Sequence, residues 1–257
     1  MRRRAREVAV RRRHRGLGAA DVLLVSYPKS GSTWLRMLLA EALTGTEANF
    51  DSIRSSVPPI GDHGGGLALL PGGGRLIRSH EPLEPIYPIA GQRVVYLLRD
   101  ARAVAVSYFH HSRRMSTHGG DLDAFCADFV AGGIGNLGPW SRHVGLALDR
   151  AREKPEATHL VRYEDLTADT ATAVTAIMGF LGVAADDGAV ARAVANNDAT
   201  RMRDKEQQST FLAGKGDVTN SVVRAGRARG WQDELSVPAR KMFEDEFGEI
   251  LTRAGYA

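Results

Sequence analysis

The residues best suited to chemistry form a short loop near the start of the chain. Segment 28–34 reads Pro-Lys-Ser-Gly-Ser-Thr-Trp and lies between an apolar run, Val22–Ser26, and a stretch with helical spacing of apolar residues. A helix N-terminus attracts phosphate because its backbone N–H groups are unpaired and carry partial positive charge. Gly31 lets the backbone approach an anion, and Lys29 adds a mobile positive charge. The loop therefore predicts an anion site, with further hydroxyl donors from Ser30, Ser32 and Thr33.

Lys29 stands out because this chain carries its positive charge mainly as arginine. It has five lysines against 29 arginines, and Lys29 is the only lysine before Lys154. The plain alternative is a strand-to-helix turn with an incidental lysine. The order of residues also differs from a Walker A loop, in which the lysine follows the second glycine. Here Lys29 precedes Gly31, so an ATPase or a kinase fits less well.

A second pair of candidate phosphate ligands follows the strand predicted at Arg93–Leu98. Arg99 ends this strand, and Ser107 lies eight residues further on, about two turns into a helix that Asp100 can cap. A guanidinium offers a two-pronged contact to phosphate, and a hydroxyl adds a shorter one. Taken alone, Arg99 is better explained by a surface ion pair with Asp100 or with Glu81.

His80 is the best candidate for a general base. It follows the short strand predicted at Arg75–Arg78 and stands next to a Gly-rich loop, 49–74. A histidine titrates near neutrality and can therefore take a proton from a hydroxyl at physiological pH. Of the other histidines, His110 and His111 are better explained as structural or exposed residues.

These segments together resemble the sulfotransferases that use 3′-phosphoadenosine 5′-phosphosulfate (PAPS). Segment 27–34 is similar to their phosphosulfate loop, YPKSGTTW, and segment 99–111 is similar to their 3′-phosphate segment. The resemblance implies that Lys29 neutralises the leaving oxygen and that His80 takes the proton of the acceptor hydroxyl. It also implies that PAPS is bound by Lys29, Ser30, Gly31, Ser32, Thr33, Trp34, Arg99 and Ser107.

Weaker matches extend the resemblance toward the C-terminus. Tyr163 belongs to a YEDL segment that in the family approaches the adenine, although it is also explained as a core tyrosine. Arg224 and Gly226 match residues that bind the 3′-phosphate, with Ala225 in place of the usual lysine. Ala199 stands where an aromatic residue usually stacks on the adenine, so a different adenine wall is expected.

The order of predicted elements favours an α/β fold. Short strands alternate with helical segments, which is typical of a parallel sheet with helices on both faces. Strands are predicted at Val22–Ser26, Arg75–Arg78, Arg93–Leu98 and Thr158–Tyr163, and helices at Trp34–Leu43, Ala101–Met115, Pro139–Arg152, Ala168–Leu181, Ala189–Asn196 and Pro238–Ala254. The resemblance implies a three-layer P-loop-like domain, which we expect to occupy residues 21–257 alone.

Composition narrows the remaining possibilities. Segment 1–15 holds eight arginines and one acid, whereas the whole chain has a net charge of +4, so the body is slightly acidic and argues against a nucleic-acid partner. Residues 1–20 are therefore predicted to be a disordered, dispensable basic tail. Cys126 is the only cysteine, which excludes an internal disulfide and favours a cytoplasmic location. No apolar run is long enough to span a membrane.

The expected activity is transfer of a sulfuryl group from PAPS to a hydroxyl of a small molecule: a metabolite, a sugar or a natural product. No metal is expected, since the transferred group carries little charge and the sequence offers no evident ligand cluster. A P-loop nucleotide kinase and a catalytically silent nucleotide-binding protein are the alternatives. The composition is typical of a GC-rich bacterial genome. The oligomeric state stays open, because a dimer motif of animal relatives is altered at Gln232 and Lys241.

Overall fold

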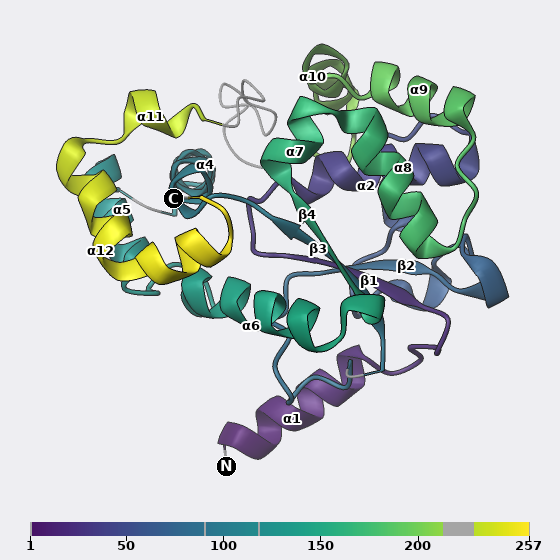
Figure 1. Ribbon diagram of the computed structural model, residues 1–257, viewed down its shortest axis with the longest axis horizontal. Coiled ribbons are helices and arrows are strands. Elements are labelled where there is room, and N and C mark those ends of the chain that lie inside the picture. Colours follow the sequence, from purple (N-terminus) through teal and green to yellow (C-terminus); the bar gives the residue numbers. More distant parts are fainter. Residues whose placement is uncertain (1, 90, 118, 213–228, 257) are drawn as a thin grey trace.

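The centre of the molecule is a sheet of four parallel strands. The computed structural model describes residues 2–89, 91–117, 119–212 and 229–256 (Figure 1). Its strands lie in the order β2-β1-β3-β4 and pair in parallel throughout. This confirms the predicted parallel sheet, with small shifts at the ends of two strands. The bounds are Val22–Ser26 for β1, Leu76–Ser79 for β2, Arg93–Leu98 for β3 and Thr158–Arg162 for β4.

Helices cover both faces of the sheet because successive strand residues point to opposite sides. Leu23 and Val25 of β1 belong to one core, and Val22 and Leu24 belong to the other. Figure 1 shows the two helical layers on either side of the sheet. The first is built by α4 (Ala101–Arg114), α5 (Leu122–Val130), α6 (Trp140–Glu153) and α12 (Val237–Arg253). The second is built mainly by α2 (Ser32–Thr44), α8 (Thr170–Leu181) and α9 (Asp187–Asn196).

Shorter elements connect these layers and surround one end of the sheet. The Gly-rich loop 49–74 contains a single helical turn and two 3₁₀ turns and is otherwise irregular. Besides α1 and the helical turn in loop 49–74, four helices were not predicted from apolar periodicity, since α5 follows a Gly-rich stretch and the others are short or strongly charged. They are α5, α7 (Tyr163–Ala168), α10 (Ala199–Gln208) and α11 (Trp231–Glu234).

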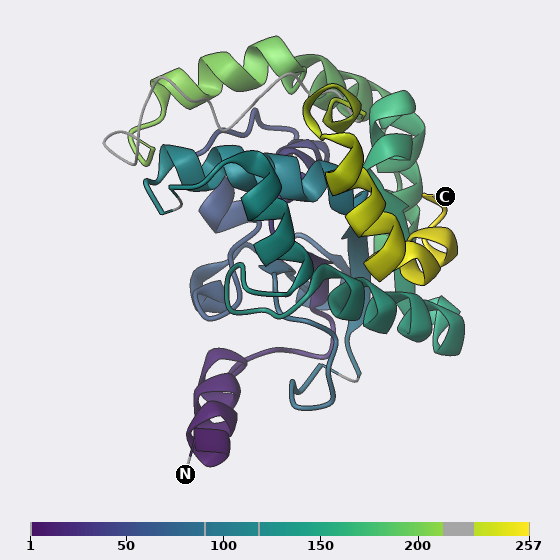
Figure 2. The same ribbon diagram turned by 90° about the vertical axis from the view of Figure 1, so that its left-hand side faces the viewer.

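The N-terminal segment differs from the disordered tail predicted from its charge. Residues Arg2–Arg13 form α1, which projects from the body with the N-terminus at its far end (Figure 2). Its last turn docks on the body. Val10 is 1% exposed and packs in the first core, and the following His14 donates to Glu81 across 2.8 Å. Arg13 also pairs with Glu81. The net charge of the segment gives no indication of this docking. It depends on Val10, Arg13 and His14, whose spacing of three and four residues places them on one helical face.

Deleting residues 1–15 is therefore expected to destabilise the protein. The deletion removes the buried Val10 and leaves the carboxylate of Glu81, which is 8% exposed, without its two basic partners. Burial of one apolar side chain and loss of a buried ion pair together suggest a decrease of about 2–5 kcal/mol in the free energy of unfolding. Urea unfolding of residues 16–257 measures it. The paired change Arg11→Gln and Arg12→Gln, at exposed positions, should leave the midpoint unchanged. An unchanged midpoint in the deletion would contradict the docking role.

Candidate active site

A cavity of about 690 Å³ opens at the carboxyl ends of the strands. Each strand leads into one charged or aromatic residue of its lining: Lys29 after β1, His80 after β2, Arg99 after β3 and Tyr163 after β4. In open α/β sheets this end of the strands is where ligands bind, because loops from several strands converge there. The topology thus gathers residues that are far apart in the sequence.

The structure brings together most of the residues predicted to form the site. Ser30 is the exception in the first loop, since it is 1% exposed and does not line the cavity. Arg224 and Gly226 lie outside the described residues. The predicted residues that line the cavity are Lys29, Gly31, Ser32, Thr33, Trp34, His80, Arg99, Ser107 and Tyr163.

The loop between β1 and α2 has the backbone of an anion cradle. Lys29 and Gly31 have positive φ angles of 70° and 99°. The positive φ is unusual for lysine and indicates a backbone held by its surroundings. A Cβ atom on Gly31 would lie 2.6 Å from the Tyr163 ring, so only glycine fits there. The Ser30 hydroxyl is buried and has no hydrogen-bond partner among the described residues.

Arg99 joins this loop to the aromatic wall. Its Nη1 donates to the main-chain oxygen of Lys29 across 3.2 Å, and its guanidinium stacks 4.1 Å from the centre of the Tyr163 ring. Its Nε is buried without a partner among the described residues. Asp100 pairs with Arg102, and Glu81 pairs with α1, so both carboxylates proposed as alternative partners of Arg99 are otherwise engaged.

His80 presents an unprotonated nitrogen to the site. Its Nδ1 lies 2.8 Å from the main-chain oxygen of Ser26, and a carbonyl can only accept, so Nδ1 carries the proton. The lone pair of Nε2 is then available as a base. Burial lowers the pKa of His80 to about 3, with a further contribution from the nearby charge of Arg78. The imidazole is therefore neutral at physiological pH.

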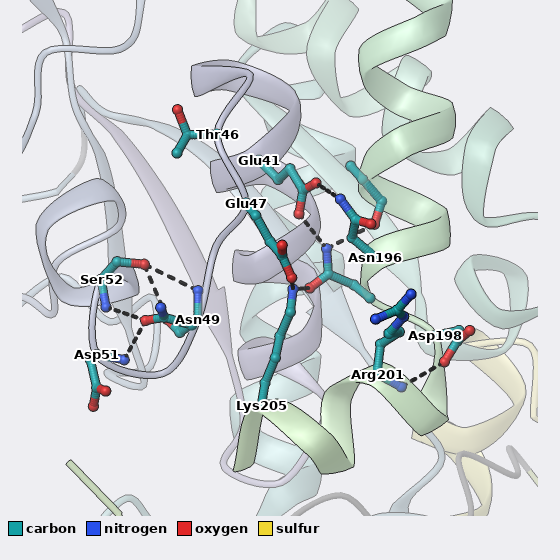
Figure 3. A network of polar contacts seen from close by, with 12 residues as sticks. Glu41, Thr46, Glu47, Asn49, Asp51, Ser52, Asn196, Asp198, Arg201 and Lys205 are labelled. Carbon is teal, nitrogen blue, oxygen red and sulfur yellow. Dashed lines mark hydrogen bonds and ion pairs between the residues drawn. The ribbon is translucent and has the colours of Figure 1, made fainter. Parts of the chain in front are cut away.

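A buried polar network holds the far wall of the cavity. The indole of Trp34 donates to the main-chain oxygen of Asn197 across 2.8 Å. The Asn197 amide donates to Glu41 of α2 (2.9 Å) and accepts from Lys205 of α10 (3.0 Å). Lys205 also pairs with Glu47 (3.2 Å), and Figure 3 shows these two residues meeting near Glu41 and its partner Asn196. The network thus ties three helices to the Trp34 side chain.

The cavity wall also contains residues whose positions were not expected from the sequence. Ala199 and Met202 line the cavity where an aromatic residue was missing, so Trp34 and Tyr163 supply the aromatic surface, with ring centres 5.8 Å apart. His111 also lines the cavity, although a structural or exposed position was preferred for it over one near the acceptor. Burial, followed by the charge of Lys29, lowers the pKa of His111 to about 4. Its position one helical turn after Ser107 was the signal that could have revealed it.

The remaining lining residues close the site from α4 and α11. Trp231 and Glu234 of α11 face it, and Glu234 contacts His110 of α4 across 2.6 Å. Among the described residues there is no group of acids, histidines or cysteines that could hold a metal ion. Within the same residues, no helix has the length and apolar character needed to cross a membrane.

Comparisons with known proteins agree with this arrangement. A family model described as the sulfotransferase domain matches residues 68–255. Cytosolic sulfotransferase 1 of Danio rerio is 27% identical over 253 residues, covering 91% of this chain and 83% of the relative. Sulfotransferase 1 family member D1 of Rattus norvegicus is 25% identical over 244 residues, covering 88% and 82%.

Solved structures share the fold. Retinol dehydratase in complex with androsterone and the inactive cofactor PAP superposes with a TM-score of 0.75 at 20% identity, covering 94% of this chain and 83% of that one. A mouse sulfotransferase complexed with PAP gives 0.74 at 21% identity, covering 96% and 89%. Because the family model matches well over half of its residues, the chain belongs to the sulfotransferase family.

Proposed function

We propose that the protein transfers the sulfuryl group of PAPS to a hydroxyl of a small-molecule acceptor, with Lys29 and His80 as its catalytic residues. One observation carries the proposal: an anion cradle and a neutral histidine with an available Nε2 line the same cavity. Relatives with the same fold bind PAP, which supports a PAPS site here. A nucleotide kinase is not favoured.

The residues present suit the nucleotide. Arg99 lines the cavity, and its Nε, which has no partner among the described residues, is a donor from which a phosphate or sulfate oxygen can accept. We assign the phosphosulfate to segment 29–33 and the 3′-phosphate to Arg99 and Ser107. Tyr163 and Trp34 form the adenine wall. From the resemblance alone, Arg224 and Gly226 complete the 3′-phosphate site.

Two residues divide the chemistry. Nε2 of His80 takes the acceptor proton as the acceptor oxygen bonds to sulfur. The ammonium of Lys29 neutralises the bridging oxygen as its bond to sulfur breaks, so that charge is stabilised where it develops. Positioning and electrostatics carry such a displacement, as they do in phosphoryl transfer.

The acceptor side of the cavity is mixed in character. Val106, Tyr108 and Trp231 offer apolar and aromatic surface, whereas His111 offers a polar nitrogen. Structures with the same fold hold androsterone and retinol, which supports a small organic acceptor. We extend the proposal to a metabolite, sugar or natural product in a cytoplasmic, bacterial setting, the last resting on composition alone.

Ligand binding and transfer test the proposal together. Thermal unfolding is measured with 3′-phosphoadenosine 5′-phosphate and, separately, with ATP and Mg²⁺. Only the first is expected to raise the unfolding temperature. Transfer of ³⁵S from labelled PAPS to a panel of phenols, alcohols and sugars then identifies the acceptor class. Stabilisation by ATP and Mg²⁺ alone, with no sulfuryl transfer, would return the protein to the kinase class.

Gly31→Ala is expected to impair nucleotide binding. The added Cβ would lie 2.6 Å from the Tyr163 ring, and the residue has a φ of 99°, so the ring or the loop must move. We expect affinity for 3′-phosphoadenosine 5′-phosphate to fall at least tenfold, since both the cradle and the aromatic wall are affected. Calorimetric titration measures it. The matched control is Gly64→Ala, at a loop glycine whose added Cβ meets no atom within 4 Å. Equal affinity in the two variants would refute the close-packing argument.

The rate is expected to stay level between pH 8 and pH 5.5. A base with an ordinary pKa near 6.5 would be only about 9% neutral at pH 5.5. His80, with a pKa of about 3, stays neutral over this range. The free energy of unfolding, in contrast, should decrease as the pH falls. Below about pH 6.5 the unfolded chain binds more protons than the folded one, so protonation favours unfolding. Single-turnover rates, with circular dichroism to verify folding at each pH, test this. A rate that falls with a midpoint near 6.5 while the protein stays folded would contradict it.

A further inference from the structure

We propose that His143, held by Tyr96, is a positioning residue that fixes the main chain of His80 and so directs its Nε2 into the cavity. The inference rests on the proposed role of His80 as the base. His143 does not itself line the cavity, and its contact with the lining is the hydrogen bond to the main-chain oxygen of His80. It acts through the hydrogen bond to His80 alone.

The hydrogen bonds run in one direction through the core. Nε2 of His143 lies 3.0 Å from the main-chain oxygen of His80, and its Nδ1 lies 2.7 Å from the Tyr96 hydroxyl. A carbonyl can only accept, so Nε2 of His143 carries the proton. Its Nδ1 must then accept from the Tyr96 hydroxyl. The His80 carbonyl thus sets the tautomer of His143, and the Tyr96 hydroxyl pairs the Nδ1 lone pair that this tautomer leaves.

The His80 carbonyl needs such a donor because it follows the end of β2. The pairing of β1 with β2 ends at Val25 and Ser79, so the sheet has no ladder position for His80. His143 replaces the missing partner from α6. The side chain of His80 is held separately by the main-chain oxygen of Ser26. Two hydrogen bonds from different elements therefore fix the backbone and the ring of the base.

The surroundings of His143 suit a fixed support. The side chain is 1% exposed, and the ring of Tyr27 packs edge-on against it with centres 5.4 Å apart. Both of its nitrogens are hydrogen-bonded, so the ring has no alternative polar partner to turn toward. A buried polar group with every hydrogen bond satisfied restricts geometry more than an apolar side chain of equal size. A displacement of about 1 Å at a reacting group lowers a rate by about 10²-fold.

The experiment compares four variants by kcat, KM and affinity for 3′-phosphoadenosine 5′-phosphate. His143→Leu removes the donor and is expected to lower kcat 10- to 100-fold, with nucleotide affinity within twofold. His143→Gln keeps an N–H at a similar reach and should recover kcat to within fivefold of the wild type. Tyr96→Phe removes the hydrogen-bond partner of His143 Nδ1, which loosens the ring, and should lower kcat at least threefold. Val144→Ala, the neighbouring buried position on α6, loses packing without this hydrogen bond and should keep kcat.

A double-mutant cycle separates positioning from packing. With His80→Ala as background, His143→Leu should leave the remaining kcat unchanged, because the group that it positions is gone. An equal loss in both backgrounds, or an equal loss in Val144→Ala, would overturn the proposal. If His143→Leu fails to fold, His143→Gln and Tyr96→Phe are compared instead, each in the wild-type and in the His80→Ala background. An active wild type with an unaffected His143→Leu would refute only this inference, whereas a wild type without sulfuryl transfer would refute the proposed function.

Discussion

His80→Ala is expected to lower kcat by about 10²–10⁴-fold while leaving nucleotide affinity nearly unchanged. That range is the usual contribution of a positioned general base. The affinity should persist because the proposed phosphate ligands lie on the loop after β1, at Arg99 and on α4, and His80 supports none of them. Single-turnover kinetics gives the rate of the chemical step, and calorimetry with 3′-phosphoadenosine 5′-phosphate gives the affinity.

Arg99→Ala is the counterpart that makes the test selective. The guanidinium is proposed to bind the 3′-phosphate, and it also contacts the Lys29 carbonyl and the Tyr163 ring. Its loss should weaken nucleotide binding by about 1.5–3 kcal/mol, the magnitude of a hydrogen bond to a charged group. If His80→Ala weakened nucleotide binding as much as Arg99→Ala, the role of His80 would be structural.

The parts of the fold that could be predicted are those encoded locally. Val22–Ser26 is a continuous apolar run followed by small polar residues and a helical pattern, and each of these signals falls within twenty residues. The strand, loop and helix appear where predicted, as β1, the cradle and α2. The docking of α1 escaped prediction because it depends on Val10 packing into the core and on His14 meeting Glu81, 67 residues away. The net charge of α1 is set by its solvent-exposed arginines and does not predict which of its residues are buried.

The same distinction applies to the site. Loop residues next to strand ends were predictable because parallel strands bring their carboxyl ends to one edge. The residue proposed to position His80 was not predictable. His143 lies 63 residues from His80 in the sequence, and its role depends on a hydrogen bond that only the folded chain makes. Asn197 likewise gains its role from Glu41 and Lys205, on two other helices. Sequence patterns identify the groups that touch a ligand more readily than the groups that orient them.

Lys29→Asn is expected to lower kcat by about 10²–10³-fold with a smaller loss of nucleotide affinity. The ammonium is proposed to act where charge develops on the leaving oxygen, and removing one such group commonly has an effect of this size. Asparagine suits the test because it adopts left-handed backbone conformations more readily than most residues, and Lys29 has a φ of 70°. The loop should therefore keep its shape. Rates with saturating PAPS and calorimetric affinities measure the two effects.

Lys29→Gly and His111 provide the controls for that result. Glycine also accepts the positive φ, so a similar loss of kcat in Lys29→Gly and Lys29→Asn would assign the effect to the missing charge. If Lys29→Gly kept the wild-type rate, the ammonium would have no catalytic role.

His111 reports on the same charge without any turnover, because burial and the charge of Lys29 together hold its pKa near 4. Removing the ammonium leaves burial and the charge of Arg114 to lower the pKa of His111, so this pKa should rise part of the way toward 6.5 in both variants. Histidine NMR resolves the shift, and an unchanged pKa would mean that the Lys29 charge does not reach this side of the cavity.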